Sequence, residues 1–188
     1  MNKARVEAFS DGVIAIIVTI MVIELKAPHE PTIKALLELL PIGLSYVLSF
    51  LVISIMWVNH HALLAKANRA DVRVLWANIN LLFWISLIPF VTAYMGENYA
   101  APLTVSVYGL VLAIASISFT PLRLAIAAQH PKHKEKQQQH QQVLRKNSIA
   151  PILYLAGAML ANVSIWISFA MFVLVPIIYF LPERHTED

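Results

Sequence analysis

Several common features are scarce or absent in this chain of 188 residues. It contains no cysteine, which excludes disulfide bonds and thiolate metal ligands. Charged residues make up only 13% of the sequence, whereas hydrophobic residues make up 59%. A soluble domain needs more polar surface than this to cover its core. Since the apolar residues also come in long blocks, the composition indicates an integral membrane protein.

Several functional motifs are also missing. The sequence has no Gly-x-Gly-x-x-Gly, no phosphate-binding loop and no Gly-x-Ser-x-Gly, so nothing in it predicts a nucleotide-dependent or serine-dependent enzyme. The Thr-Val-Gly-Tyr-Gly carbonyl filter of ordinary potassium channels is absent too. A net charge of +3 fits Lys/Arg-rich cytoplasmic loops better than nucleic-acid binding.

The apolar blocks predict an all-α membrane protein with six spans in one domain covering residues 1–188. A helix of about 20 residues crosses the hydrocarbon core of a bilayer. Helix-breaking Pro28 and Pro31 separate the first two spans. The last apolar block is too long for one span, so we divide it at Asn162-Val163-Ser164. The predicted helices cover about 4–25, 32–61, 74–95, 102–128, 143–162 and 164–181.

The basic residues predict the orientation. With six spans and a cytoplasmic N-terminus, Lys26 and Lys34 fall on the outer side, and the other twelve of the 14 Lys and Arg fall on the cytoplasmic side. Positive charge gathers in cytoplasmic loops, so both termini are expected in the cytoplasm of a multi-pass cell-membrane protein. The polar stretch 129–147 is then a solvated cytoplasmic connection.

The start of the first predicted helix carries polar residues that three interpretations fit. Asp11 lies where the apolar run begins, and a carboxylate at that depth is costly unless it is paired or hydrated. Ser10 and Asp11 could be a helix-start feature with Arg5 as an interfacial anchor. They could instead join a polar network between helices, or form a proton or ion site.

An isoleucine stripe runs along the outward half of the same helix. Ile16, Ile20 and Ile23 share one face because their spacings are four and three, and Thr19 flanks them. Such a stripe is either a packing or lipid-facing surface, or a pore lining in which apolar rings gate by dewetting.

Two further groups of polar residues lie near the inner membrane face. His60 and His61 point about 100° apart on a helix, so a shared metal is not expected. One of them is expected to bond to Asp11 or Ser10. Asn78 and Asn80 open the third predicted span, where buried amides usually bridge helices.

At Arg5-x-x-x-Phe9-Ser10-Asp11, the sequence resembles the bacterial members of the lysosomal potassium channel family, transmembrane protein 175. The hallmark of that family is Arg-x-x-x-Phe-Ser-Asp at the start of the first helix. The histidine-bearing end of the second span, the Asn-containing start of the third and the sequence Leu-Ile-Pro-Phe at 87–90 are similar as well.

The resemblance implies a homotetramer with six helices per subunit and a central pore that conducts potassium and other monovalent cations passively. It implies that the first helix lines this pore, with Ile16, Ile20 and Ile23 as the constriction and with Thr19 and Ile16 governing ion preference. It also implies a polar network that contains Arg5, Phe9, Ser10, Asp11, Asn78 and one of His60 and His61.

No cofactor, metal or catalytic residue is expected, and the partners are the bilayer and permeant K⁺. A secondary transporter or proton-coupled carrier is the alternative, but it needs a titratable midplane site, and the second to sixth predicted spans have no carboxylate at the membrane centre. A small membrane enzyme using His60, His61 and Asp11 is a third hypothesis, supported by no known catalytic spacing.

Overall fold

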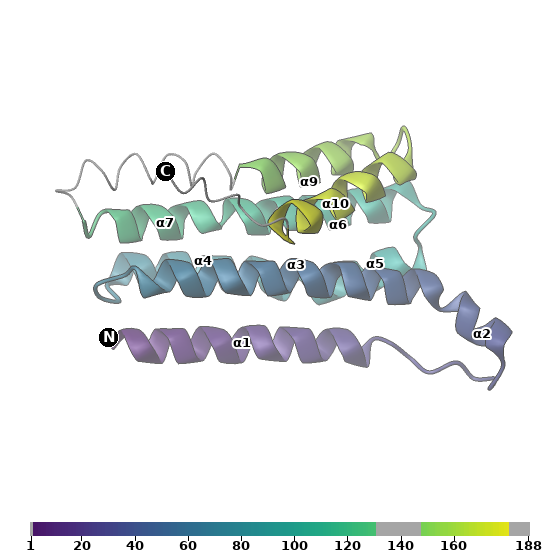
Figure 1. Ribbon diagram of the computed structural model, residues 1–188, viewed down its shortest axis with the longest axis horizontal. Coiled ribbons are helices and arrows are strands. Elements are labelled where there is room, and N and C mark those ends of the chain that lie inside the picture. Colours follow the sequence, from purple (N-terminus) through teal and green to yellow (C-terminus); the bar gives the residue numbers. More distant parts are fainter. Residues whose placement is uncertain (1, 131–147, 181–188) are drawn as a thin grey trace, which may run out of the picture.

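The computed structural model describes residues 2–130 and 148–180, and every regular element in these two ranges is a helix (Figure 1). The prediction of an all-α protein is therefore confirmed for the described part of the chain. The start of the fifth predicted span at 143, the end of the sixth at 181 and most of the stretch 129–147 lie outside the described residues. So do six of the basic residues that were placed in the cytoplasm: Lys132, Lys134, Lys136, Arg145, Lys146 and Arg184.

The helices run nearly parallel to one long axis and form stacked layers (Figure 1). At the bottom of the view, α1 packs on α3, α4 and α5; α6 and α7 lie on the other side of that layer, and α9 and α10 cover α6. The helices are α1 (Lys3–Ile23), α2 (Ile33–Glu38), α3 (Leu40–Ala65), α4 (Val72–Ser86), α5 (Ile88–Glu97), α6 (Pro102–Ile117), α7 (Phe119–Ala127), α9 (Ile149–Leu160) and α10 (Ile165–Phe180).

Four helical stretches are long and apolar enough to cross a membrane: α1, α3, α4 with α5, and α6 with α7. The last two are 26 residues long when their two halves are counted together. α9 and α10 are shorter, with 12 and 16 residues. They bracket the turn at residues 161–164, which includes the Asn-Val-Ser sequence where the last apolar block was divided.

Prolines explain why three predicted spans are each seen as two helices. The interruptions at Leu39, Leu87 and Ser118 lie two or three residues before Pro41, Pro89 and Pro121. Proline has no backbone N–H and its ring crowds the carbonyl four residues back, so the helical hydrogen-bond ladder is interrupted there. The helix expected over 32–61 is accordingly divided into α2 and α3.

Two glycines allow α10 to pack closely against α6 and α9. The ring of Phe172 lies where a side chain at Gly109 or Gly157 would be: a Cβ built there would be 2.6 Å or 2.5 Å from the nearest ring atom. Tyr108 and Tyr154 flank the ring, with centroids 5.4 Å and 6.1 Å from it. All three aromatic rings are fully buried and form the centre of this half of the protein.

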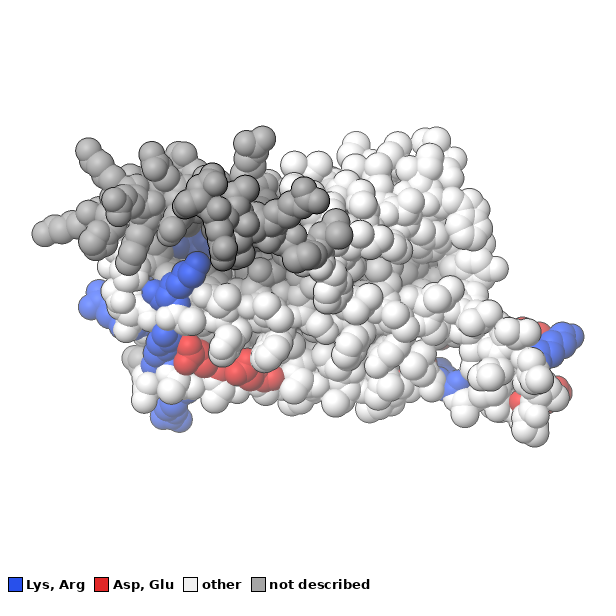
Figure 2. All heavy atoms as spheres, viewed as in Figure 1, with Lys and Arg blue, Asp and Glu red and all other residues white. Residues whose placement is uncertain are grey.

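Charged side chains lie mainly at the two ends of the long axis, and the broad middle band between them is uncharged on the face shown in Figure 2. The N-terminus, the loop between α3 and α4 and the end of α7 share one end, and α2 lies at the other (Figure 1). An apolar band between polar ends is what a bilayer-spanning protein requires.

Candidate functional site

α1 has two distinct faces. The face toward α3, α4 and α5 carries Val6, Ser10, Ile14, Ile17 and Met21, which are all buried. Their spacings of four, four, three and four place them along one side of the helix. Ser10 is the one polar residue among them, so it must find a partner inside the subunit.

A buried chain of hydrogen bonds supplies that partner and joins α1 to α4 and α3. The amide nitrogen of Asn78 donates to the Ser10 hydroxyl at 2.9 Å, and this hydroxyl donates to the Val6 carbonyl at 2.8 Å. The Oδ1 of Asn78 lies 2.7 Å from Nε2 of His60. The structure therefore brings together Ser10, His60 and Asn78, and of the two histidines it selects His60.

The donor and acceptor roles along this chain follow from one another. Since the amide nitrogen of Asn78 faces Ser10, its oxygen faces His60 and can only accept, so Nε2 of His60 carries the proton. Nδ1 of His60 has no hydrogen-bond partner among the described residues. Each hydrogen bond runs in one direction, from His60 through Asn78 and Ser10 to the α1 backbone, which fixes how α1 is rotated.

The remaining residues of the expected network lie elsewhere. Asp11 is half-buried and accepts a hydrogen bond from the indole Nε1 of Trp57 at 2.9 Å. Arg5 and Phe9 are exposed on α1, and His61 is exposed on α3 beside the Trp57 ring. The sequence predicted no contact for Trp57. Aromatic residues are common at the membrane interface, so its position near the end of a span needed no partner to explain it.

Further contacts hold the end of the protein where α1 begins. The ammonium of Lys3 donates to the Ala65 carbonyl at the end of α3 and lies 3.7 Å from the Glu7 carboxylate. The side chain of Gln129 binds the loop between α3 and α4: its oxygen accepts from the Asn68 and Arg69 amides, and its nitrogen donates to the Arg69 carbonyl and to Asp71. Sequence reasoning assigned Gln129 only to a solvated connection.

Asp71 has a second role as the N-cap of α4. Its carboxylate accepts from the Val74 amide at 3.0 Å, and this hydrogen bond, with that from Gln129, lowers the pKa of Asp71 below its ordinary value. Because an ionised carboxylate also interacts well with the positive end of a helix dipole, Asp71 stabilises the start of α4 at neutral pH.

The isoleucine stripe occupies a different face of α1 from the buried one. Ile16, Ile20 and Ile23 are 59%, 43% and 72% exposed, although each is a large apolar side chain. The Thr19 hydroxyl donates to the Ile16 carbonyl of its own helix at 2.8 Å. An apolar strip therefore lies on the outer side of the bundle, left largely uncovered by the other residues that the structure describes.

The described residues contain no group of three or more His, Asp or Glu side chains that could hold a metal ion. Ser10 and Asp11 instead bind side chains of α4 and α3, and Lys3 binds the end of α3. α1 is thus bonded to its neighbours on one side and presents an apolar face outward.

Comparisons with known proteins show which protein family the chain resembles. Residues 5–89 match the family model described as the endosomal/lysosomal potassium channel TMEM175. A potassium channel of Chryseobacterium sp. is 37% identical over 188 residues, which covers all of this chain and 97% of the relative. A potassium channel of Chamaesiphon minutus is 36% identical over 179 residues, which cover 89% of this chain and 88% of the relative.

The solved structures include a similar fold. The crystal structure of a lysosomal potassium-selective channel TMEM175 homologue from Chamaesiphon minutus superimposes with a TM-score of 0.84 at 30% identity, over 94% of this chain and 95% of that one. The family is one of ion channels, and the matches extend over almost the full length of this chain and of these relatives. This multi-pass membrane protein therefore belongs to the TMEM175 family of potassium channels.

Proposed function

We propose that this chain is a potassium-permeable channel that works as a homotetramer with six membrane-spanning helices per subunit in a single domain. In this proposal, α1 of each subunit lines a central pore, and K⁺ passes through it passively without a cofactor. Ile16, Ile20 and Ile23 form the constriction, and Thr19 beside them influences which cation passes. Relatives named potassium channels support the choice of ion.

The observation that carries the proposal is the exposed isoleucine strip on an otherwise firmly held helix. Ile16 and Ile23 are seven residues apart, so the strip extends for about 10 Å along α1. Four such strips around one axis would form stacked apolar rings, and rings of this kind close a pore by dewetting. The chain of hydrogen bonds through Ser10 would keep the strip directed toward that axis.

The charge distribution supports cytoplasmic termini. Lys26 lies beyond the end of α1 and Lys34 lies on α2, at the opposite end of the protein from Lys66 and Arg69 in the α3–α4 loop and from Arg73 at the start of α4. Under the positive-inside rule, the end with more Lys and Arg faces the cytoplasm, and the N-terminus shares that end.

Recording from purified protein in planar bilayers tests the proposal. We expect potassium currents, and the absence of current at every voltage and pH would reject the channel. Ile16→Asn should raise the conductance because a polar ring wets the constriction. Val22→Asn is the matched control: Val22 is also β-branched and exposed on α1, but it lies about 120° around the helix from Ile16. An unchanged current in Ile16→Asn, or equal effects of both variants, would reject Ile16 as part of the constriction.

A further inference from the structure

A buried guanidinium lies away from α1, on the other side of α3. Arg123, on α7, is only 8% exposed, although sequence analysis counted it among the basic residues of the cytoplasmic side. It makes no hydrogen bond or salt bridge with any other residue that the structure describes. The Phe119 ring lies beside it, with its centroid 5.9 Å from the guanidinium carbon, and Tyr179 of α10 interacts with it electrostatically. A buried charge without a counter-charge is costly, so an anion beside this guanidinium would be favourable.

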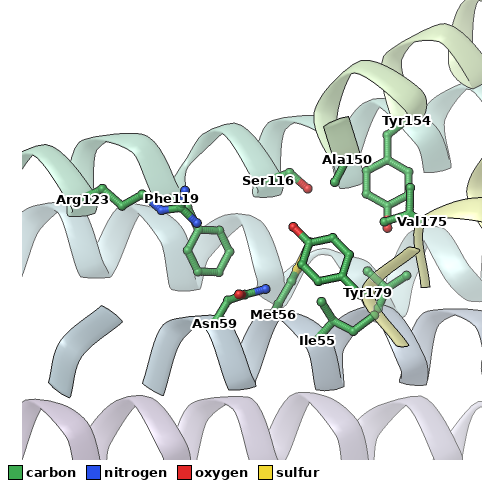
Figure 3. Close-up of a pocket in the computed structure, with 11 residues that line it drawn as sticks. Ile55, Met56, Asn59, Ser116, Phe119, Arg123, Ala150, Tyr154, Val175 and Tyr179 are labelled. Carbon is green, nitrogen blue, oxygen red and sulfur yellow. The ribbon is translucent and has the colours of Figure 1, made fainter. Parts of the chain in front are cut away.

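The guanidinium borders a pocket between α3, α6, α7, α9 and α10 (Figure 3). Other polar residues line the same pocket: Asn59 on α3, Ser116 on α6 and Tyr179 on α10. The side chains of Asn59 and Ser116 make no hydrogen bond with described residues. The groups around the cavity include several N–H and O–H donors but no carboxylate, since every other lining residue is apolar or aromatic.

The size of the cavity limits what can occupy it. Its volume is about 30 Å³, which is room for about two waters. Waters alone would solvate the guanidinium but would leave its charge uncompensated in a buried site. A halide-sized anion with one water fits this space, and its charge balances that of Arg123. A phosphate group is too large to enter the cavity as a whole.

We propose that this pocket binds a small inorganic anion of the chloride class, held by the Arg123 guanidinium and by donors from Asn59 and Ser116. The bound anion neutralises a charge in the pocket that residues of α3, α7 and α10 line. It therefore stabilises the packing of the outer helices on the α3 layer, far from the isoleucine strip.

The first test measures thermal unfolding of purified protein at constant potassium concentration, with chloride replaced stepwise by gluconate. Gluconate is too large for the cavity. A ligand at about ten times its Kd should raise the Tm of a protein of this size by about 3–6 °C. Arg123→Gln should remove the chloride dependence. Arg69→Gln, which removes an exposed guanidinium from the loop between α3 and α4, should keep it.

A second variant remains informative if Arg123→Gln does not fold. Asn59→Asp keeps the side-chain size and places a carboxylate in the pocket as a permanent counter-charge. We expect a higher Tm than wild type in gluconate and no further rise with chloride. A chloride dependence as large as that of wild type would contradict the proposal.

Crystals grown in bromide give a direct observation, because bromide scatters anomalously. A peak beside Arg123 is expected in wild type and no peak in Asn59→Asp. The proposal is overturned if the Tm is the same in chloride and gluconate and no peak appears. It is also overturned if a phospholipid copurifies with wild type but not with Arg123→Gln. A third contrary result is a chloride dependence that appears only after removal of residues 181–188, which include Glu183, Glu187 and Asp188.

Discussion

Replacing Asn78 tests whether the buried hydrogen-bond chain holds α1 in place. Asn78→Leu keeps a side chain of similar size but removes both the donor to Ser10 and the acceptor for His60. Ser10 retains its bond to the Val6 carbonyl. The imidazole N–H of His60, however, is left buried without an acceptor, so the main cost of the substitution falls on His60.

The magnitude follows from that orphaned N–H. A buried donor without a partner costs about 1–3 kcal/mol, whereas hydrogen bonds between membrane helices contribute about 0.6 kcal/mol on average and about 1.7 kcal/mol at most. Because the Asn78 oxygen is the one partner of Nε2 among the described residues, we expect a loss of about 1–3 kcal/mol. For a chain of this size, that lowers the Tm by about 2–12 °C.

Thermal unfolding of the purified protein, followed in a double-mutant cycle, is the assay. His60→Leu leaves the Asn78 oxygen without a donor, and the pair His60→Leu/Asn78→Leu leaves neither group orphaned. The pair should therefore lose less than the sum of the two single losses, with a coupling of about 0.5 kcal/mol or more. Asn80→Leu is the control, since Asn80 is exposed two residues along α4 and should shift stability by less than about 0.5 kcal/mol.

Two results would refute this reasoning. If Asn78→Leu is no less stable than Asn80→Leu, the chain does not hold the helices together. If the two single losses simply add, His60 and Asn78 do not act through the hydrogen bond between them. A coupled loss of stability with unchanged potassium conductance would mean that the chain supports the fold without setting the rotation of α1 in the proposed pore.

Three further predictions concern other parts of the protein. Gly157→Ala should cost about 1–3 kcal/mol, because its Cβ would lie 2.5 Å from the Phe172 ring; a thermal melt checks this, and adding Phe172→Leu should recover part of the loss. Gln129→Ala should increase amide hydrogen exchange at residues 68 and 69, whose N–H groups it now binds, and unchanged exchange would show that this contact is dispensable. Because the pKa of Asp71 is lowered in the folded protein, its stabilising effect is present above the unfolded-state pKa and is lost as the pH falls through the lowered value; Asp71→Asn should remove that part of the acid dependence of the Tm and leave the rest.

The resemblance at the start of the chain located the polar group that holds α1, but the residues themselves left its partners open. Ser10, Asn78 and a histidine were expected to meet, whereas the separate pairing of Asp11 with Trp57 was not. His60 and His61 are neighbours in sequence with the same chemistry. Which of them faces α4 depends on how α3 is rotated within the bundle, and that rotation is set by packing along its whole length.

The sequence by itself determined the class of protein, an all-α membrane protein, whereas the proline interruptions within its predicted spans were seen only in the structure. The class follows from local properties, because the length of an apolar run does not depend on which helix lies beside it. Only the tertiary structure decided that His60 joins the chain from Asn78 to Ser10, that Arg123 is buried beside a pocket rather than exposed with the other basic residues, and that the isoleucine strip of α1 is left uncovered. Each of these depends on which faces of helices distant in the sequence meet. Those faces are set by many packing contacts together, and the sequence of one helix does not show which side faces its neighbour.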